Sequence, residues 1–124
     1  MPGAVSAVAQ PDEGTVLVHC AGGVDRTGLV AALILRVADV GVETIAADYA
    51  ESEVNWAPSV DGWIGEAPDE AERGKRRLLS VMPAAAMREV LAELERSHGS
   101  ARSYLTRAGV DPNDLDRIRK RLRG

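Results

Sequence analysis

The hydrophobic positions divide the chain into one strand-like segment followed by several helical segments. Residues 15–19, TVLVH, form a β-branched apolar run, which is the pattern of a strand covered on both faces. Residues 27–40 are apolar almost all round, as expected of a buried central helix. In residues 42–50 the apolar side chains recur at i, i+3, i+4, i+7 and i+8, which predicts a helix with one buried face.

Shorter segments complete the predicted order of elements. Residues 3–10 favour a short helix, and helices are predicted within residues 84–123, where glycines separate three segments. Residues 55–74 combine Pro, Gly and acidic residues without a clear period, so we expect a loop or substrate lid there. Trp56 and Trp63 lie in this segment, and core anchors are the favoured interpretation for them because the chain has no Phe.

The predicted sheet is incomplete. A strand buried on both faces has two backbone edges to satisfy, yet no second segment has strand character. The pattern therefore predicts part of an α/β layer structure, in which residues 1–124 form a single partial domain that is mostly helical. Its one clear strand would lie at about 15–20, and the unpaired edge of that strand would favour self-association.

Composition narrows the class of protein. The 124 residues carry a net charge of −4 and the pI is about 5.2, which argues against a nucleic-acid partner. The arginines near the end of the chain scatter around a helix, so we expect them to be solvated rather than to form a docking patch. No apolar stretch is long enough to span a bilayer, and the N-terminus lacks the charge of a secretion signal. The single cysteine excludes an internal disulfide and fits a reducing, cytoplasmic setting.

The candidate chemistry lies in HCAGGVDRTG, residues 19–28. Cys20 stands at the carboxyl end of the predicted strand and Arg26 opens the next helix. Backbone N–H groups in the loop between them can point at one centre, and the two glycines allow the angles that such a nest requires. With the helix N-terminus, this predicts a phosphate-binding loop over 20–26, formed by Ala21, Gly22, Gly23, Val24, Asp25 and Arg26.

The same loop predicts a nucleophile. Donors that hold phosphate also stabilise a thiolate, so the pKa of Cys20 is expected well below its ordinary value of about 8.5. Arg26 can grip two phosphate oxygens with its planar guanidinium. Asp25 is the only acid inside the loop and the candidate for protonating the leaving group. His19 either orients the loop or supports the thiolate, and Thr27 can donate its hydroxyl to the sulfur. No metal ion or cofactor is required, because the loop and guanidinium supply the charge stabilisation.

This segment resembles the His-Cys-x5-Arg-Thr-Gly signature of the protein tyrosine phosphatase superfamily, and in particular a bacterial family whose loop reads His-Cys-x-x-Gly-Lys-Asp-Arg-Thr-Gly. ADYAES, residues 47–52, is similar to that family's Asp-Tyr-x-x-Ser segment, and residues 98–122 are similar to its C-terminal pattern. The resemblance implies a cysteine-dependent phosphatase fold that hydrolyses phosphate monoesters through a phosphocysteine. Cys20 would be the nucleophile, Arg26 the phosphate clamp, and Asp25 the residue implicated in acid catalysis.

Two departures from the resembled family affect the functional prediction. Val24 replaces a lysine that the family ties to acidic or phosphoinositide substrates, so the substrate stays open among phosphorylated proteins and small phosphate monoesters. Only 19 residues precede Cys20, whereas family members place the signature past the middle of the chain. We therefore expect the chain to correspond to the C-terminal half of such an enzyme. The alternative function is a truncated, non-catalytic remnant that binds phosphate.

Overall fold

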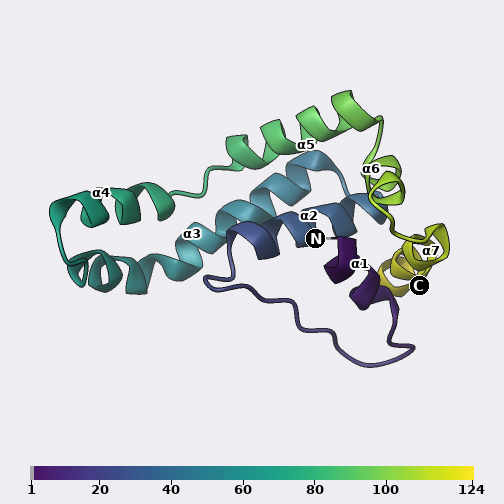
Figure 1. Ribbon diagram of the computed structural model, residues 1–124, viewed down its shortest axis with the longest axis horizontal. Helices are drawn as coiled ribbons and strands as arrows, with labels where there is room; N and C mark the ends of the chain where they lie inside the picture. Colours follow the sequence, from purple (N-terminus) through teal and green to yellow (C-terminus); the bar gives the residue numbers. More distant parts are fainter. Residues whose placement is uncertain (1) are drawn as a thin grey trace.

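The computed structural model describes residues 2–124, which Figure 1 shows as a chain of helices. Within that range the helices are joined by turns and loops, and there is no β-strand. Their bounds are α1 (Pro2–Ala9), α2 (Asp25–Val37), α3 (Val42–Gly65), α4 (Glu70–Leu79), α5 (Ala84–His98), α6 (Ala101–Arg107) and α7 (Pro112–Arg123). Helices α5, α6 and α7 lie where the sequence pattern predicted helices between residues 84 and 123.

Helix α2 lies among the other helices and shares its buried residues between two hydrophobic clusters (Figure 1). One cluster joins α2 to α1, α6 and α7 through side chains such as Val5, Leu105 and Ile118. The other joins α2 to α3 and α5 through Ile45 and Leu91. The nearly all-round apolar pattern of residues 27–40 is explained, because helices cover α2 on more than one side.

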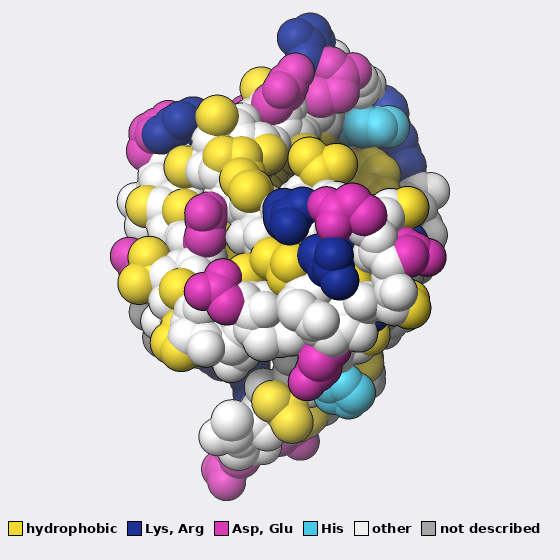
Figure 2. All heavy atoms as spheres, turned by 90° about the vertical axis from the view of Figure 1, so that its left-hand side faces the viewer, with side chains coloured by type: hydrophobic (Ala, Val, Ile, Leu, Met, Phe, Trp, Pro, Cys, Tyr) yellow, Lys and Arg dark blue, Asp and Glu magenta, His cyan; other side chains and the backbone are white. Residues whose placement is uncertain are grey.

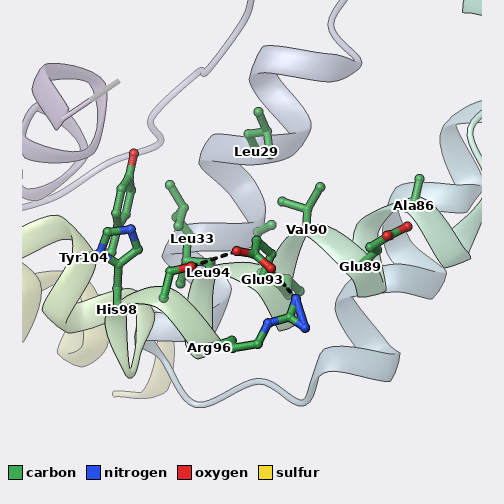
Figure 3. A pocket seen from close by; sticks show the side chains of 13 residues that line it. Leu29, Leu33, Ala86, Glu89, Val90, Glu93, Leu94, Arg96, His98 and Tyr104 are labelled. Atoms are coloured by element: carbon green, nitrogen blue, oxygen red, sulfur yellow. Dashed lines mark hydrogen bonds and ion pairs between the residues drawn. The ribbon is translucent and has the colours of Figure 1, made fainter.

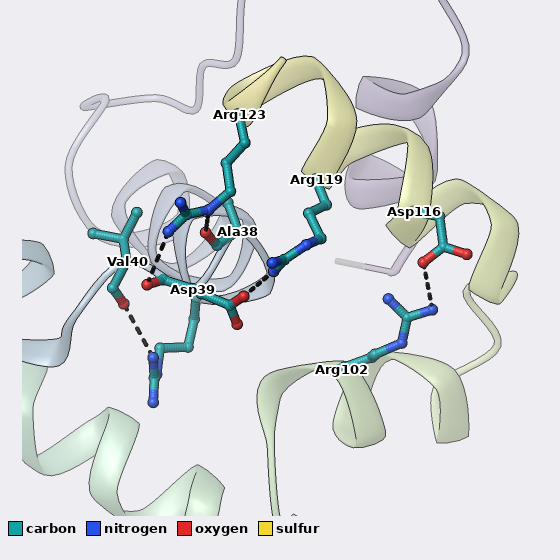
Figure 4. Close-up of polar contacts among 8 residues, drawn as sticks. Ala38, Asp39, Val40, Arg102, Asp116, Arg119 and Arg123 are labelled. Carbon is teal, nitrogen blue, oxygen red and sulfur yellow. Dashed lines mark hydrogen bonds and ion pairs between the residues drawn. The ribbon is translucent and has the colours of Figure 1, made fainter.

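The last helix is tied to the carboxyl end of α2, as Figure 4 shows. Arg119 pairs with the Asp39 carboxylate, and its hydrogen bond lowers the pKa of that carboxyl group. Arg123 donates to the backbone carbonyl that follows α2. Close by, Arg36 of α2 pairs with Glu95 of α5, with 2.7 Å between Nε and Oε1. The α7 arginines Arg119 and Arg123 are exposed, as expected, and they also anchor this helix at the end of α2.

The strand predicted at about residues 15–20 is wrong, and with it the α/β fold class. This segment has no regular secondary structure, and residues 2–124 contain no sheet that it could join. A strand is stabilised by backbone hydrogen bonds to a neighbouring strand, and the described chain supplies no such neighbour. The side chains still alternate, since Val16 and Val18 pack against the core whereas Leu17 is 83% exposed. Self-association through this segment stays a prediction.

The loop predicted over residues 55–74 is wrong as secondary structure. Helix α3 continues through Pro58 to Gly65, and α4 begins at Glu70. The Asp69 carboxylate caps α4 by accepting a hydrogen bond from the Glu72 N–H at 2.8 Å. The pattern concealed these helices because they pack mainly on each other rather than on the core. That this segment covers a bound substrate stays a prediction.

The two tryptophans contact each other on α3, and Trp63 also contacts α4, so their interpretation as core anchors is wrong. The rings of Trp56 and Trp63 have centroids 5.0 Å apart, and the Arg76 guanidinium lies 5.1 Å from the centroid of the Trp63 ring. Neither tryptophan belongs to a described core cluster, and both are half-buried. They stabilise a two-helix arm, formed by the last part of α3 together with α4, which extends from the rest of the molecule in Figure 1.

The arm exposes hydrophobic side chains. Leu78 is 79% exposed, Val54 and Leu79 are exposed as well, and so is Val81 just after the arm. Figure 2 looks at this end of the molecule and shows hydrophobic side chains interspersed with charged ones. In residues 2–124, no helix is both long enough and apolar enough to cross a membrane.

Candidate active site

Residues 20–24 form an irregular loop that leads directly into α2. Gly23 has a φ of +69°, a left-handed conformation that glycine adopts without steric cost. The backbone N–H groups of Gly23, Val24 and Thr27 hydrogen-bond to the Cys20 sulfur. The loop thus gathers several backbone donors around one atom.

Hydrogen bonds lower the pKa of the Cys20 thiol from 9.0 to about 6. The Thr27 hydroxyl contributes most and the Thr27 backbone N–H next, while partial burial opposes them and the N–H groups of Gly23 and Val24 add to the lowering. Thr27 Oγ1 is buried and has no hydrogen-bond partner of ordinary geometry in the described chain, so its hydroxyl is free to donate to the sulfur. A thiol with this pKa is mostly thiolate at pH 7, which is the nucleophilic form.

A cavity of about 470 Å³ opens beside the thiol. Helix α1, the segment before the loop and the first turns of α2 form its walls, with the lining residues Ala4, Val18, His19, Cys20, Ala21, Arg26, Thr27 and Val30. Arg26 is exposed and pairs with no carboxylate in residues 2–124, so its N–H donors are free to bind an anion. The structure therefore brings Cys20, Arg26, Thr27 and His19 to one cavity.

Asp25 lies outside this cavity. Its carboxylate accepts a long hydrogen bond from the Tyr49 hydroxyl, with 3.4 Å between Oη and Oδ1. Both residues line a separate hollow of about 180 Å³ between α2, α3 and α5. Burial, followed by the charge and hydrogen bond of Asp25, raises the pKa of Tyr49. In this conformation the loop carboxylate is directed to α3 rather than to the Cys20 cavity.

Sequence analysis missed Tyr49 as a neighbour of the loop. A Cβ atom added at Gly28 would lie only 3.1 Å from Cδ2 and 3.2 Å from Cε2 of the Tyr49 ring. Glycine is unfavourable inside a helix, so its presence in the first turn of α2 was a signal that another group approaches closely there. The pattern of residues 42–50 identified the buried face of α3 but not its contact with this turn.

A larger cavity lies elsewhere and lacks the reactive groups. It measures about 680 Å³ and runs between α2 and α5 (Figure 3). Apolar side chains such as Leu29, Leu33 and Val90 line it, and the rings of His98 and Tyr104, which are tilted relative to each other with centroids 5.0 Å apart, lie at one end. Cys20 and Arg26 do not reach it. The candidate active site is therefore the smaller cavity, because the thiol and the guanidinium meet there.

Comparison with known proteins identifies the class. Residues 2–124 match the profile of the tyrosine phosphatase family, and the chain belongs to that family. It is 32% identical over 127 residues to a tyrosine-protein phosphatase of Nostoc commune, a match that covers 93% of this chain and 41% of the relative. It is 34% identical over 125 residues to the triple specificity protein phosphatase PtpB of Mycobacterium tuberculosis, covering 88% of this chain and 44% of the relative. The chain thus spans less than half the length of these bacterial relatives. No solved structure gave a significant match.

Proposed function

We propose that this protein hydrolyses phosphate monoesters in the manner of a tyrosine phosphatase, with Cys20 as the nucleophile. One observation carries the proposal: a thiol with a pKa of about 6 lines the same cavity as an arginine that has no carboxylate partner within residues 2–124. The low pKa supplies a thiolate at neutral pH, and the guanidinium of Arg26 supplies the charge that attracts phosphate. Membership of the tyrosine phosphatase family supports the same chemistry.

The phosphate group would be held by the loop and by the beginning of α2. Backbone N–H groups of residues 21–26 would donate to its oxygens, while the guanidinium of Arg26 would bind two of them side by side. The donors that surround the Cys20 sulfur in the free protein support this arrangement. Binding would place the phosphorus atom next to the thiolate, and the positive field of loop and guanidinium would stabilise the charge of the transition state.

The reaction would proceed in two displacements. In the first, the Cys20 thiolate forms an S–P bond while the bond from phosphorus to the ester oxygen breaks, and the leaving oxygen takes up a proton. In the second, water attacks the phosphocysteine, the S–P bond breaks, and inorganic phosphate and the thiolate are released. Asp25 is the proposed acid of the first step. This role requires its carboxylate to turn away from Tyr49, to which it is bonded in the structure.

The proposed substrates are phosphorylated proteins or small phosphate monoesters, and the proposed compartment is the cytoplasm. The relatives' names, tyrosine-protein phosphatase and triple specificity protein phosphatase, support phosphorylated proteins as the class. A reducing compartment keeps the low-pKa thiol of Cys20 active, because such thiols are readily oxidised. Comparing hydrolysis of phosphotyrosine, phosphoserine and phosphoinositide compounds identifies which of them this chain accepts.

A second candidate function is phosphate binding without turnover. Two observations favour it: residues 15–20 have no strand to support the loop, and Asp25 is directed away from the thiol. Such a protein would bind inorganic phosphate or vanadate at the loop and would not release a phenol from an aryl phosphate.

Hydrolysis of p-nitrophenyl phosphate separates the two candidates. We expect turnover at neutral pH that vanadate inhibits. It should fall to background in Cys20→Ser, since a serine hydroxyl is not ionised at neutral pH. The nitrophenolate is a good leaving group, so this substrate tests the nucleophile without requiring the acid. Vanadate binding without turnover in the unmodified chain would overturn the phosphatase proposal and support the second candidate.

A further inference from the structure

We propose that Tyr49 is a positioning residue for the candidate active site: its ring, seated on Gly28, and its hydroxyl, bonded to Asp25, hold the first turn of α2 against α3. The inference deepens the proposed function, on which its consequence for catalysis rests. Its direct consequence is the ionisation of Cys20, which can be measured without turnover.

The contacts of Tyr49 with Asp25 and Gly28 lie on either side, in the sequence, of two residues that line the Cys20 cavity. The hydroxyl of Tyr49 lies 3.4 Å from Oδ1 of Asp25, and its ring lies where a Cβ atom at Gly28 would approach to 3.1 Å. Arg26 and Thr27 stand between these contacts in the sequence, and both line the Cys20 cavity. Because Tyr49 holds both ends of one helical turn, its position determines where Arg26 and Thr27 lie.

Releasing the turn would make the thiolate less stable for two reasons. The Thr27 hydroxyl makes the largest contribution to the low pKa of Cys20, and its distance from the sulfur would increase as the turn moves. Asp25 would lose its partner, and a carboxylate free to approach the sulfur disfavours a second negative charge. The other ionisable groups that line the cavity are His19 and Arg26, and α1 contributes only Ala4. Both effects would raise the pKa of Cys20.

The first test compares the two tyrosines of the chain. Cys20 is the only cysteine, so the rate of alkylation by iodoacetamide against pH reports this thiol alone. We expect Tyr49→Phe to raise the Cys20 pKa by about one unit, which lowers the thiolate fraction at pH 6 about fivefold. Tyr104→Phe is the matched control, because Tyr104 packs against His98 and does not line the Cys20 cavity formed by residues 2–124. Equal titrations of Tyr49→Phe and the unmodified protein would overturn the proposal.

The second test uses the contact between Tyr49 and Gly28. We expect Gly28→Ala to raise the Cys20 pKa, because the added methyl displaces the ring or the turn, whereas Gly74→Ala in α4 meets open space and should not. Removing the ring should abolish the effect, so Gly28→Ala/Tyr49→Ala should titrate like Tyr49→Ala. Circular dichroism verifies that each variant is folded. An effect of Gly28→Ala that is the same with and without the ring contradicts the positioning role.

The outcomes also separate this inference from the proposed function. If the unmodified protein hydrolyses no aryl phosphate and Tyr49→Phe still raises the Cys20 pKa, the phosphatase proposal fails and the positioning role holds. If the protein turns over and the Tyr49→Phe titration is unchanged, the phosphatase proposal holds and the positioning role fails.

Discussion

Helix α2 is held differently at its two ends. At the carboxyl end, Arg119 pairs with Asp39, Arg123 donates to a backbone carbonyl, and Arg36 pairs with Glu95. At the amino end, the donors of an irregular loop point at one sulfur, and the guanidinium of the first turn has no anionic partner in the described chain. The anchored end satisfies its polar groups within the protein. The other end leaves donors available, and available donors at a helix N-terminus are what an anion requires.

The largest expected effect comes from replacing, one at a time, an arginine at each end of α2 by alanine. Arg26→Ala should lower kcat/KM for an aryl phosphate by about 10²–10³-fold, because a preorganised donor to the transition state is lost. Its unfolding temperature should hardly change, since the side chain is exposed and makes no ion pair within the described chain. Arg36→Ala should leave kcat/KM nearly unchanged and lower the unfolding temperature slightly, because it breaks a partly exposed ion pair worth about 1 kcal/mol or less. Steady-state kinetics and thermal denaturation measure the two effects.

A result in which Arg36→Ala loses activity as strongly as Arg26→Ala would contradict the division between the two ends. It would mean that the loop depends on the anchor at the far end of the helix. Arg26→Lys provides the control for charge alone, because an ammonium keeps the charge and loses the planar pair of donors. We expect Arg26→Lys to recover only part of the lost activity.

The next effect concerns stability and compares the core with the segment before the loop. Leu105 is fully buried in the cluster that joins α6 to α2, so Leu105→Ala should destabilise the fold by about 2–5 kcal/mol. Leu17 is 83% exposed, so Leu17→Ala should change the free energy of unfolding by less than about 0.5 kcal/mol. Urea denaturation measures both. If Leu17→Ala were the more destabilising, the segment would be buried in solution against a surface that the described chain does not provide.

The sequence predicted the candidate site better than the fold, because the site is local. Cys20, Arg26 and Thr27 lie within eight residues of one another, so spacing alone places them around one loop, and the cavity contains all three. Asp25 belongs to the same stretch but is directed elsewhere, because its partner Tyr49 comes from α3. Local spacing indicates which residues are near one another. Local spacing does not indicate which of these residues is bonded to a distant element and so directed away from the site.

The fold was predicted less well where packing partners decide the structure. The apolar run at residues 15–19 has the composition of a strand, but strand formation depends on a neighbour that composition does not reveal. The second half of α3 contacts α4 through Trp63, on which the Arg76 side chain lies, so its apolar positions follow a local partner and show no core-facing period. By contrast, the apolar pattern of α2 was interpreted correctly, because a helix covered on several sides is apolar nearly all round.

A smaller effect is expected at the amino end from the hydroxyl that bonds to the sulfur. Thr27→Val keeps the shape of the side chain and removes the strongest cause of the low Cys20 pKa. The midpoint of alkylation against pH should therefore move upward from about 6 toward 9.0, and less thiolate should be present at neutral pH. Thr27→Ser retains a hydroxyl and should titrate close to the unmodified protein. A midpoint that stays near 6 in Thr27→Val would assign the lowering to the backbone donors instead.

The smallest effect is expected at the carboxyl end, where Asp39 combines two roles. It has a φ of +61°, a left-handed conformation that disfavours most residues, and it pairs with Arg119. Asp39→Ala loses the ion pair and keeps a Cβ atom in the disfavoured conformation, whereas Asp39→Gly loses the ion pair but also removes that Cβ atom and its steric cost. We therefore expect Asp39→Gly to unfold at a higher temperature than Asp39→Ala. The hydrogen bond from Arg119 lowers the Asp39 pKa, so the contribution of the pair should be present at neutral pH and lost as the pH falls through that lowered value. Since this end of α2 is separate from the loop, both variants should keep the Cys20 titration of the unmodified protein. A shift in that titration would show that α2 transmits strain from its carboxyl end to the loop at its amino end.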